Sequence, residues 1–136
     1  MIDLKTLLYP SFVTVVTLLL YFVLTANVGR ARIKHKVPVP QTSGNPDFER
    51  VLRVQQNTLE QLIAFLPSLW LFSLFVSSNW GAGIGAVWIV GRILYAWGYY
   101  QATEKRMFGF GINVLTFLVL LLGSLVGIIR TFLTVV

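Results

Sequence analysis

The sequence lacks cysteine altogether and has one histidine and five acidic residues among 136. The absence of cysteine excludes a disulfide scaffold, a thiolate metal site and a cysteine nucleophile, and one histidine leaves no multi-histidine metal site in the chain. Charged residues are also scarce, at 12% against roughly a quarter in globular proteins. Because 56% of the residues are hydrophobic, an ordinary soluble domain is excluded and a small membrane protein is indicated.

Three long runs contain no charge, at residues 6–29, 61–91 and 107–129. At roughly 20 residues per span, the middle run is too long for one helix, and the turn-like segment 77–83 divides it. The first run is longer than a signal peptide core and no small-residue cleavage site follows it, so it is expected to be a retained span. The sequence predicts an all-α, four-transmembrane-helix bundle forming a single domain over 1–136, with helices at about 6–29, 47–76, 82–103 and 109–133.

Positive charge gathers in two connections. The first carries Arg30, Arg32, Lys34 and Lys36, and the third carries Lys105 and Arg106. Four spans place both connections on one side, and the positive-inside rule predicts that this side is cytoplasmic, with both termini opposite. Contact with anionic lipid headgroups accounts for part of this charge equally well, and no nucleic-acid partner is expected because no nucleic-acid motif accompanies it.

Polar residues recur within the second expected helix. Arg53, Asn57 and Glu60 follow an i, i+4, i+7 spacing and share one helical face. Residues 61–76 alone are too short to span a bilayer, so this stripe must enter the membrane. Ionisable residues at such depth are expected to face a bundle interior or a water-filled cavity.

The third expected helix repeats this pattern with Arg92, Tyr95 and Tyr99, and Arg106 continues the stripe two turns later. Glu60 is the natural partner of Arg92, and such a pair alone would only join two helices. The remaining excess of cations and hydrogen-bond donors around one acid suggests an anionic polar ligand that carries one ammonium group. The other large aromatic residues fit interfacial anchors: Trp70, Trp80, Trp88, Trp97 and Tyr100.

The polar residues also resemble a known family. The pattern Glu49-Arg50-Val51-x-Arg53-x-Gln55-x-Asn57-x-x-Glu60 resembles the second-helix signature of the MAPEG superfamily, membrane-associated proteins of eicosanoid and glutathione metabolism. The segment Gly91-Arg92-x-x-Tyr95-x-x-Gly98-Tyr99 with Lys105-Arg106 resembles its third helix. Residues 28–37 are similar to the first loop of the type 2 microsomal glutathione transferases, which form one subgroup with the leukotriene C synthases. Together these matches cover nearly the whole chain.

This resemblance implies a four-helix protomer in a homotrimer that binds glutathione between protomers as co-substrate, without a metal. It places a set of glutathione-binding residues in one protomer and two more in its neighbour: Arg53, Asn57, Glu60, Tyr95 and Tyr99, then Arg32 and Gln55. Arg106 would be the catalytic residue at the thiol. The implied activity is conjugation of glutathione to a lipophilic electrophile, with glutathione-dependent reduction of lipid hydroperoxides as a second reaction.

Elementary chemistry agrees with these roles. An arginine guanidinium can donate two parallel hydrogen bonds to a carboxylate, so arginines match the two carboxylates of glutathione. The Glu60 carboxylate matches its ammonium group. A thiol reacts as its thiolate, which the permanent charge of Arg106 would stabilise without acting as a base. The apolar substrate would arrive through the bilayer.

Three positions depart from the family pattern, and two other functions stay open. Gln61 replaces an aromatic residue, Pro67 lies one turn beyond the usual proline, and Ile33 stands where leukotriene C synthases have a second arginine. A non-enzymatic lipid-binding member of the superfamily would have altered glutathione positions. A small four-helix multidrug transporter would need an acid in its first helix, and residues 6–29 contain none.

Overall fold

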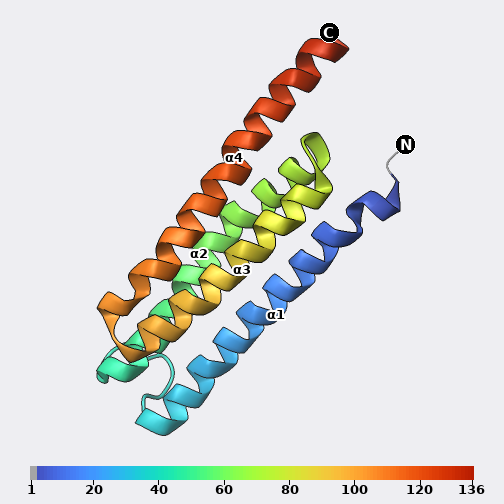
Figure 1. The fold of residues 1–136 in the computed structure, drawn as a ribbon. Coiled ribbons are helices and arrows are strands. Elements are labelled where there is room, and N and C mark those ends of the chain that lie inside the picture. The colour runs from blue at the N-terminus through green and yellow to red at the C-terminus, as the bar shows by residue number, and fades with distance from the viewer. Residues whose placement is uncertain (1–2) are drawn as a thin grey trace.

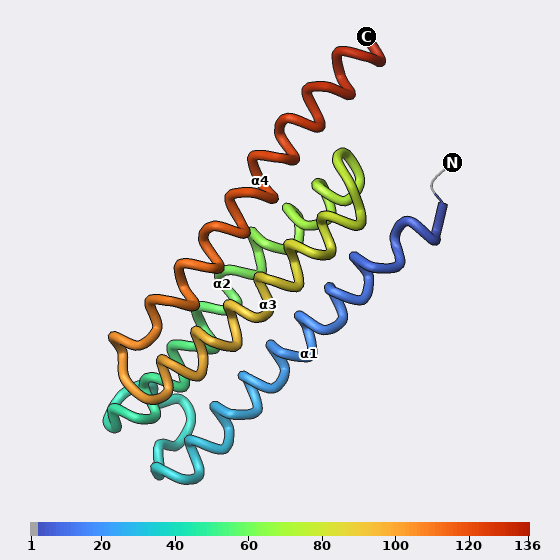
Figure 2. Tube along the Cα trace, in the orientation of Figure 1, coloured from blue at the N-terminus to red at the C-terminus, as the bar shows by residue number. Residues whose placement is uncertain are grey.

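The computed structural model describes residues 3–136 as a bundle of four long helices and one short 3-10 helix (Figure 1). The elements are α1 (Leu4–His35), α2 (Pro46–Phe75), α3 (Ser78–Gln101), η1 (Thr103–Arg106) and α4 (Met107–Val135). Helices α2 and α3 lie between α1 and α4, and the start of α1 and the end of α4 lie at one end of the bundle (Figures 1 and 2). The α1–α2 loop and η1 lie together at the other end. The predicted helical bundle is confirmed, as is the placement of both basic connections at one end.

Three segments of the described chain are long and apolar enough to cross a membrane: Leu4–His35, Pro46–Phe75 and Thr103–Val135. Their outer faces carry large exposed apolar side chains, such as Phe12 and Phe22 on α1 and Leu122 and Leu125 on α4. A surface of this kind requires lipid or another protein chain to cover it. The structure therefore supports a membrane protein.

Helix α1 extends six residues beyond the predicted boundary, so Arg30, Arg32 and Lys34 are helical rather than part of a loop. The helix ends where Lys36 adopts a left-handed conformation, with φ 56°, and its N–H bonds to the Arg32 carbonyl. Basic side chains in a last helical turn interact favourably with the negative end of the helix dipole. Charge alone was therefore a poor marker of the helix end.

The turn between α2 and α3 is much shorter than the predicted segment 77–83. Ser77 caps α3 by accepting a hydrogen bond from the Trp80 N–H at 3.2 Å, and the helix begins at Ser78. A Cβ on Gly81 would lie 2.6 Å from Ser73 Oγ. This glycine therefore permits close packing of α3 on α2. The predicted division of this run into two helices is confirmed, but residues 78–83 belong to α3 and not to the turn.

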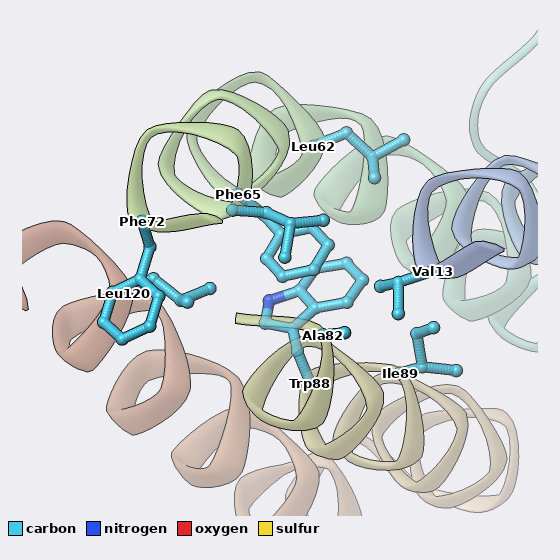
Figure 3. Packing of buried hydrophobic residues seen from close by; sticks show 9 residues of the cluster. Val13, Leu62, Phe65, Phe72, Ala82, Trp88, Ile89 and Leu120 are labelled. Atoms are coloured by element: carbon cyan, nitrogen blue, oxygen red, sulfur yellow. The ribbon is translucent and has the colours of Figure 1, made fainter. Parts of the chain in front are cut away.

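Aromatic stacking dominates the main apolar core. Figure 3 shows Trp88 of α3 against Phe65 of α2, with ring centroids 3.9 Å apart and planes 7° from parallel. Trp88 has no exposed surface, so its predicted place at the membrane interface is wrong. Trp70 is held by a hydrogen bond from its Nε1 to Thr14 Oγ1 of α1 at 3.0 Å.

Two glycines bring the backbone around η1 into close contact. A Cβ on Gly109 would collide with the backbone N of Tyr95, and a Cβ on Gly98 would collide with the carbonyl of Lys105. Glycine at these two positions lets α4 and η1 lie directly against α3. The contact at Gly98 places Arg106, the last residue of η1, beside the final turns of α3.

Candidate functional site

A cavity of about 340 Å³ lies where α2, α3, η1 and α4 meet. Its lining residues are Arg53, Asn57, Tyr95, Tyr99, Thr103, Arg106, Met107 and Phe110. Five of them were predicted as site residues: Arg53, Asn57, Tyr95, Tyr99 and Arg106. A second cavity of about 540 Å³ shares Arg53, Tyr99 and Thr103 with it and reaches the α1–α2 loop at Thr42. The two cavities are neighbours at the basic end of the bundle, with these three residues between them.

Tyrosines of α3 form one wall and hold the arginine of η1. The rings of Tyr95 and Tyr99 meet edge to face with centroids 5.6 Å apart, an arrangement that aromatic pairs favour. The Arg106 guanidinium carbon lies 5.6 Å from the Tyr99 ring centroid, within cation–π range. Arg106 also donates a hydrogen bond to the Thr103 carbonyl at 2.6 Å. The guanidinium is therefore anchored beside the cavity before any ligand binds.

Arg53, which lines this cavity, forms an ion pair with Glu60, with 3.1 Å between Arg53 Nη1 and Glu60 Oε1. Their side chains are 46% and 59% exposed. Arg53 faces a cavity, one of the two surroundings expected for this stripe, whereas Glu60 is not among the residues that line it. The predicted pairing of Glu60 with Arg92 is wrong. The rotation of α2 about its axis turns Glu60 outward, where Arg53 lies two turns earlier on the same face.

Arg92 bonds to α2 through other residues. Its Nη1 donates to Asn57 Oδ1 at 2.8 Å and to Thr58 Oγ1 at 3.3 Å. The Arg92 side chain is completely buried, and its guanidinium carbon lies 4.3 Å from the Tyr95 ring centroid. Arg92 thus lies directly behind two residues of the cavity wall.

The two site residues expected from a neighbouring protomer lie away from the cavity. Gln55 faces α1, where its Nε2 donates to the Tyr21 hydroxyl at 2.9 Å. Arg32 donates to the carbonyl of Gln41 at 2.7 Å, and its guanidinium lies 4.9 Å from the Phe48 ring centroid. Within one chain, neither of these predicted residues joins the others.

Three lining residues were missed by sequence reasoning: Thr103, Met107 and Phe110. Phe110 lies one helical turn after Arg106, and that i, i+4 spacing could have placed it on the arginine face. Thr103 had no such signal, because it lies on the wall only through the 3-10 turn of η1. Met107 begins α4 directly after this turn.

The charges around the cavity favour an anion. Arg53, Arg92 and Arg106 contribute three positive charges against one negative charge from Glu60, a local formal charge of +2. Tyrosine hydroxyls and the Asn57 amide add neutral hydrogen-bonding groups. Fold and site together define a helical membrane protein with a cationic, tyrosine-lined cavity suited to a polar anionic ligand.

Comparison with known proteins agrees with this description. The sequence model of the MAPEG family matches residues 10–126. The chain belongs to the MAPEG family.

Its relatives include an uncharacterized protein of Synechocystis sp., 57% identical over 90% of each chain. Human microsomal glutathione S-transferase 2 is 43% identical over 83% of this chain and 76% of its own length. Leukotriene C4 synthase of Cavia porcellus is 37% identical over 70% of this chain and 63% of its own. The last two relatives are named as a glutathione transferase and a leukotriene synthase.

Proposed function

We propose that this protein is a membrane glutathione transferase that binds glutathione in the cavity and activates its thiol for attack on lipophilic electrophiles. One observation carries the proposal: Arg106 is anchored on Tyr99 in the same cavity as Arg53, Asn57 and Tyr95. The family relationship to microsomal glutathione S-transferase 2 supports it.

Glutathione suits the charges of this cavity. It has two carboxylates and one ammonium group, with a net charge of about −1 once its thiol is neutral. Arg53 can bind a carboxylate through a paired hydrogen-bond fork, and Glu60 can accept hydrogen bonds from the ammonium group. Asn57, Tyr95 and Tyr99 supply the remaining hydrogen bonds.

Arg106 acts on the sulfur. A cysteine-type thiol has a pKa of about 8.5, so only about 3% is thiolate at pH 7. A nearby guanidinium that lowers the thiol pKa by about two units supplies about 2.7 kcal/mol and makes most of the thiol reactive. The thiolate then attacks an electrophilic carbon, a carbon–sulfur bond forms, and the leaving group departs with its electron pair.

The same thiolate supports reduction of a lipid hydroperoxide. Sulfur attacks the terminal peroxide oxygen, the oxygen–oxygen bond breaks, and the alkoxide takes a proton to become an alcohol. A second glutathione then reduces the sulfenic acid, which gives glutathione disulfide and water. No additional residue is required, so both reactions depend on Arg106.

We further infer that the working unit is a homotrimer with the site between protomers. Glu60 lies at the middle of α2, yet its side chain is 59% exposed in one chain. A charged pair near the bilayer centre needs a protein or aqueous surrounding, which a neighbouring protomer would provide. Arg32 and Gln55, which lie away from the cavity of their own chain, are the residues proposed to complete the site of the neighbour.

We also propose that α3 crosses the bilayer with the other helices, because its 24 residues extend about 36 Å alongside α2. The basic end would face the cytoplasm. A cysteine introduced for Thr42, an exposed residue at that end, should resist an impermeant thiol reagent added outside intact cells. Labelling from outside would contradict this orientation.

The proposed function is tested with the whole chain purified in detergent. Conjugation of glutathione to a generic aryl halide and reduction of a lipid hydroperoxide are assayed side by side. We expect turnover that saturates with glutathione and is largely lost at neutral pH in Arg106→Ala. Binding of lipid without either reaction would instead identify the alternative, a non-enzymatic lipid-binding protein, and would refute the transferase proposal.

A further inference from the structure

Arg92 is a buried cation without an acidic partner. It has no exposed surface in the middle of the bundle, where an isolated charge is costly. The ion pairs within residues 3–136 are Arg50–Asp47 and Arg53–Glu60, and neither includes Arg92. Its protein hydrogen bonds all come from Nη1 and go to neutral oxygens of Asn57 and Thr58. Because burying this charge is costly, we expect Arg92 to do more than join α3 to α2.

The contact with Asn57 determines which end of that amide faces the cavity. A guanidinium can only donate hydrogen bonds, so the group that meets Arg92 must be the amide oxygen. The Asn57 oxygen is therefore turned toward Arg92, at 2.8 Å from Arg92 Nη1. Because Asn57 also lines the cavity, the end left for a ligand is its NH₂ group, a donor.

Arg92 also supports the aromatic wall from behind. Its guanidinium carbon lies 4.3 Å from the ring centroid of Tyr95, which in turn meets Tyr99 edge to face. Tyr99 lies below the guanidinium of Arg106. Arg92 is thus the buried end of a chain of contacts that reaches the cavity surface.

We propose that Arg92 is a positioning residue that sets the hydrogen-bonding polarity of the cavity. By holding the Asn57 oxygen, it makes Asn57 present a donor and so selects a ligand with an oxygen acceptor there, a carboxylate or a peptide carbonyl. In identifying that ligand as glutathione, the inference rests on the proposed function. It adds that the affinity for glutathione depends on a residue that the ligand does not touch.

A double-mutant cycle tests this dependence, with reduced glutathione as the probe and calorimetry in detergent as the measurement. We expect Arg92→Met and Asn57→Ala each to raise Kd about tenfold, as for loss of one hydrogen bond to a charged group. If Arg92 acts through Asn57, the double variant should also lose about tenfold rather than about a hundredfold. The KM for glutathione should rise while kcat changes little, and Arg92→Lys, which keeps a donor, should restore most of the affinity.

Two further variants separate positioning from simple destabilisation. Leu120→Ala removes a completely buried side chain from the apolar core, so it should lower stability without changing Kd. Asn57→Asp keeps an acceptor for Arg92, and with it the fold, but removes the donor from the cavity. It should raise Kd at least tenfold even if Arg92→Met does not fold.

The outcomes distinguish the two proposals. If the double variant raises the glutathione Kd by the product of the two single effects, the positioning role is overturned. Wild-type affinity in Asn57→Asp would overturn it as well. Either result leaves the proposed function intact. A wild-type protein that binds no glutathione would overturn both.

Discussion

Helices α2 and α3 pack differently in their two halves. Toward the α2–α3 turn, Phe65 and Trp88 stack in parallel at 3.9 Å and neither has exposed surface. Toward η1, Tyr95 and Tyr99 meet at 72° and border a cavity of about 340 Å³. We call the part around Phe65 and Trp88 the stacked half and the part around Tyr95 and Tyr99 the open half. The stacked half holds the two helices at a fixed separation, and at that separation the open half contains a polar cavity.

The largest effect expected is on the stacked half. Phe65→Ala removes a completely buried ring that lies on Trp88. The residues around the cavity left by the ring lose their dispersion contacts with it. We therefore expect the free energy of unfolding to fall by about 3 kcal/mol. Thermal or denaturant unfolding in detergent measures this loss, and the glutathione Kd of the folded fraction should stay unchanged.

Ile63→Ala is the matched control for this change. It lies two residues earlier on α2 with 73% of its surface exposed, so it should hardly affect stability. Equal losses in both variants would mean that the two halves do not differ as described.

Arg106→Ala tests the open half. We expect turnover at pH 6.5 to fall about 50-fold, because a thiol pKa of about 6.5 leaves about half of the thiol ionised there and a pKa of about 8.5 leaves about 1%, while glutathione binding and assembly persist. The sign of the pH dependence follows: the arginine lowers the thiol pKa, so its benefit is full below about pH 6.5, fades between about pH 6.5 and 8.5, and is lost above about pH 8.5, where the free thiol is itself ionised.

Rate profiles between pH 6 and 9.5 measure this difference. Lys105→Ala, which removes the neighbouring cation of η1, is the control and should keep the wild-type profile. A constant ratio between wild type and Arg106→Ala at every pH would refute thiol activation by Arg106.

Glu60→Gln tests the binding of the ammonium group. The substitution keeps shape but removes the negative charge, so the glutathione Kd should rise about tenfold, within the range for a hydrogen bond between charged groups. Glu104→Gln removes an acid from η1 and should leave binding unchanged. Calorimetry that gives the same Kd for Glu60→Gln and wild type would exclude this role.

The sequence was sufficient for the bundle but not for its boundaries. Long uncharged runs are diagnostic in a membrane protein because lipid offers no partners for exposed backbone, so the number of helices could be predicted. The ends could not, because they depend on particular contacts. Ser77 caps α3, and the fit of Gly81 against Ser73 is visible only once α2 and α3 are packed together.

Spacing likewise indicated which polar residues share a face but not what that face meets. The stripes of Arg53 with Asn57 and of Tyr95 with Tyr99 do converge on one cavity. The partner of Arg92 could not be predicted, because it depends on the rotation of α2 relative to α3. That rotation turns Asn57 toward Arg92 and Glu60 outward.

Gly98→Ala should have the smallest effect, and it tests how the open half is held. Its added methyl group would collide with the Lys105 carbonyl, so η1 must shift and carry Arg106 away from Tyr99. Because a small misplacement of a catalytic group lowers turnover more than binding, we expect kcat to fall about fivefold with little change in Kd. Gly83→Ala, on the same helix, provides the control, because a Cβ added there would have no neighbour within 4 Å. Wild-type kcat in Gly98→Ala would show that the backbone contact between α3 and η1 does not position Arg106.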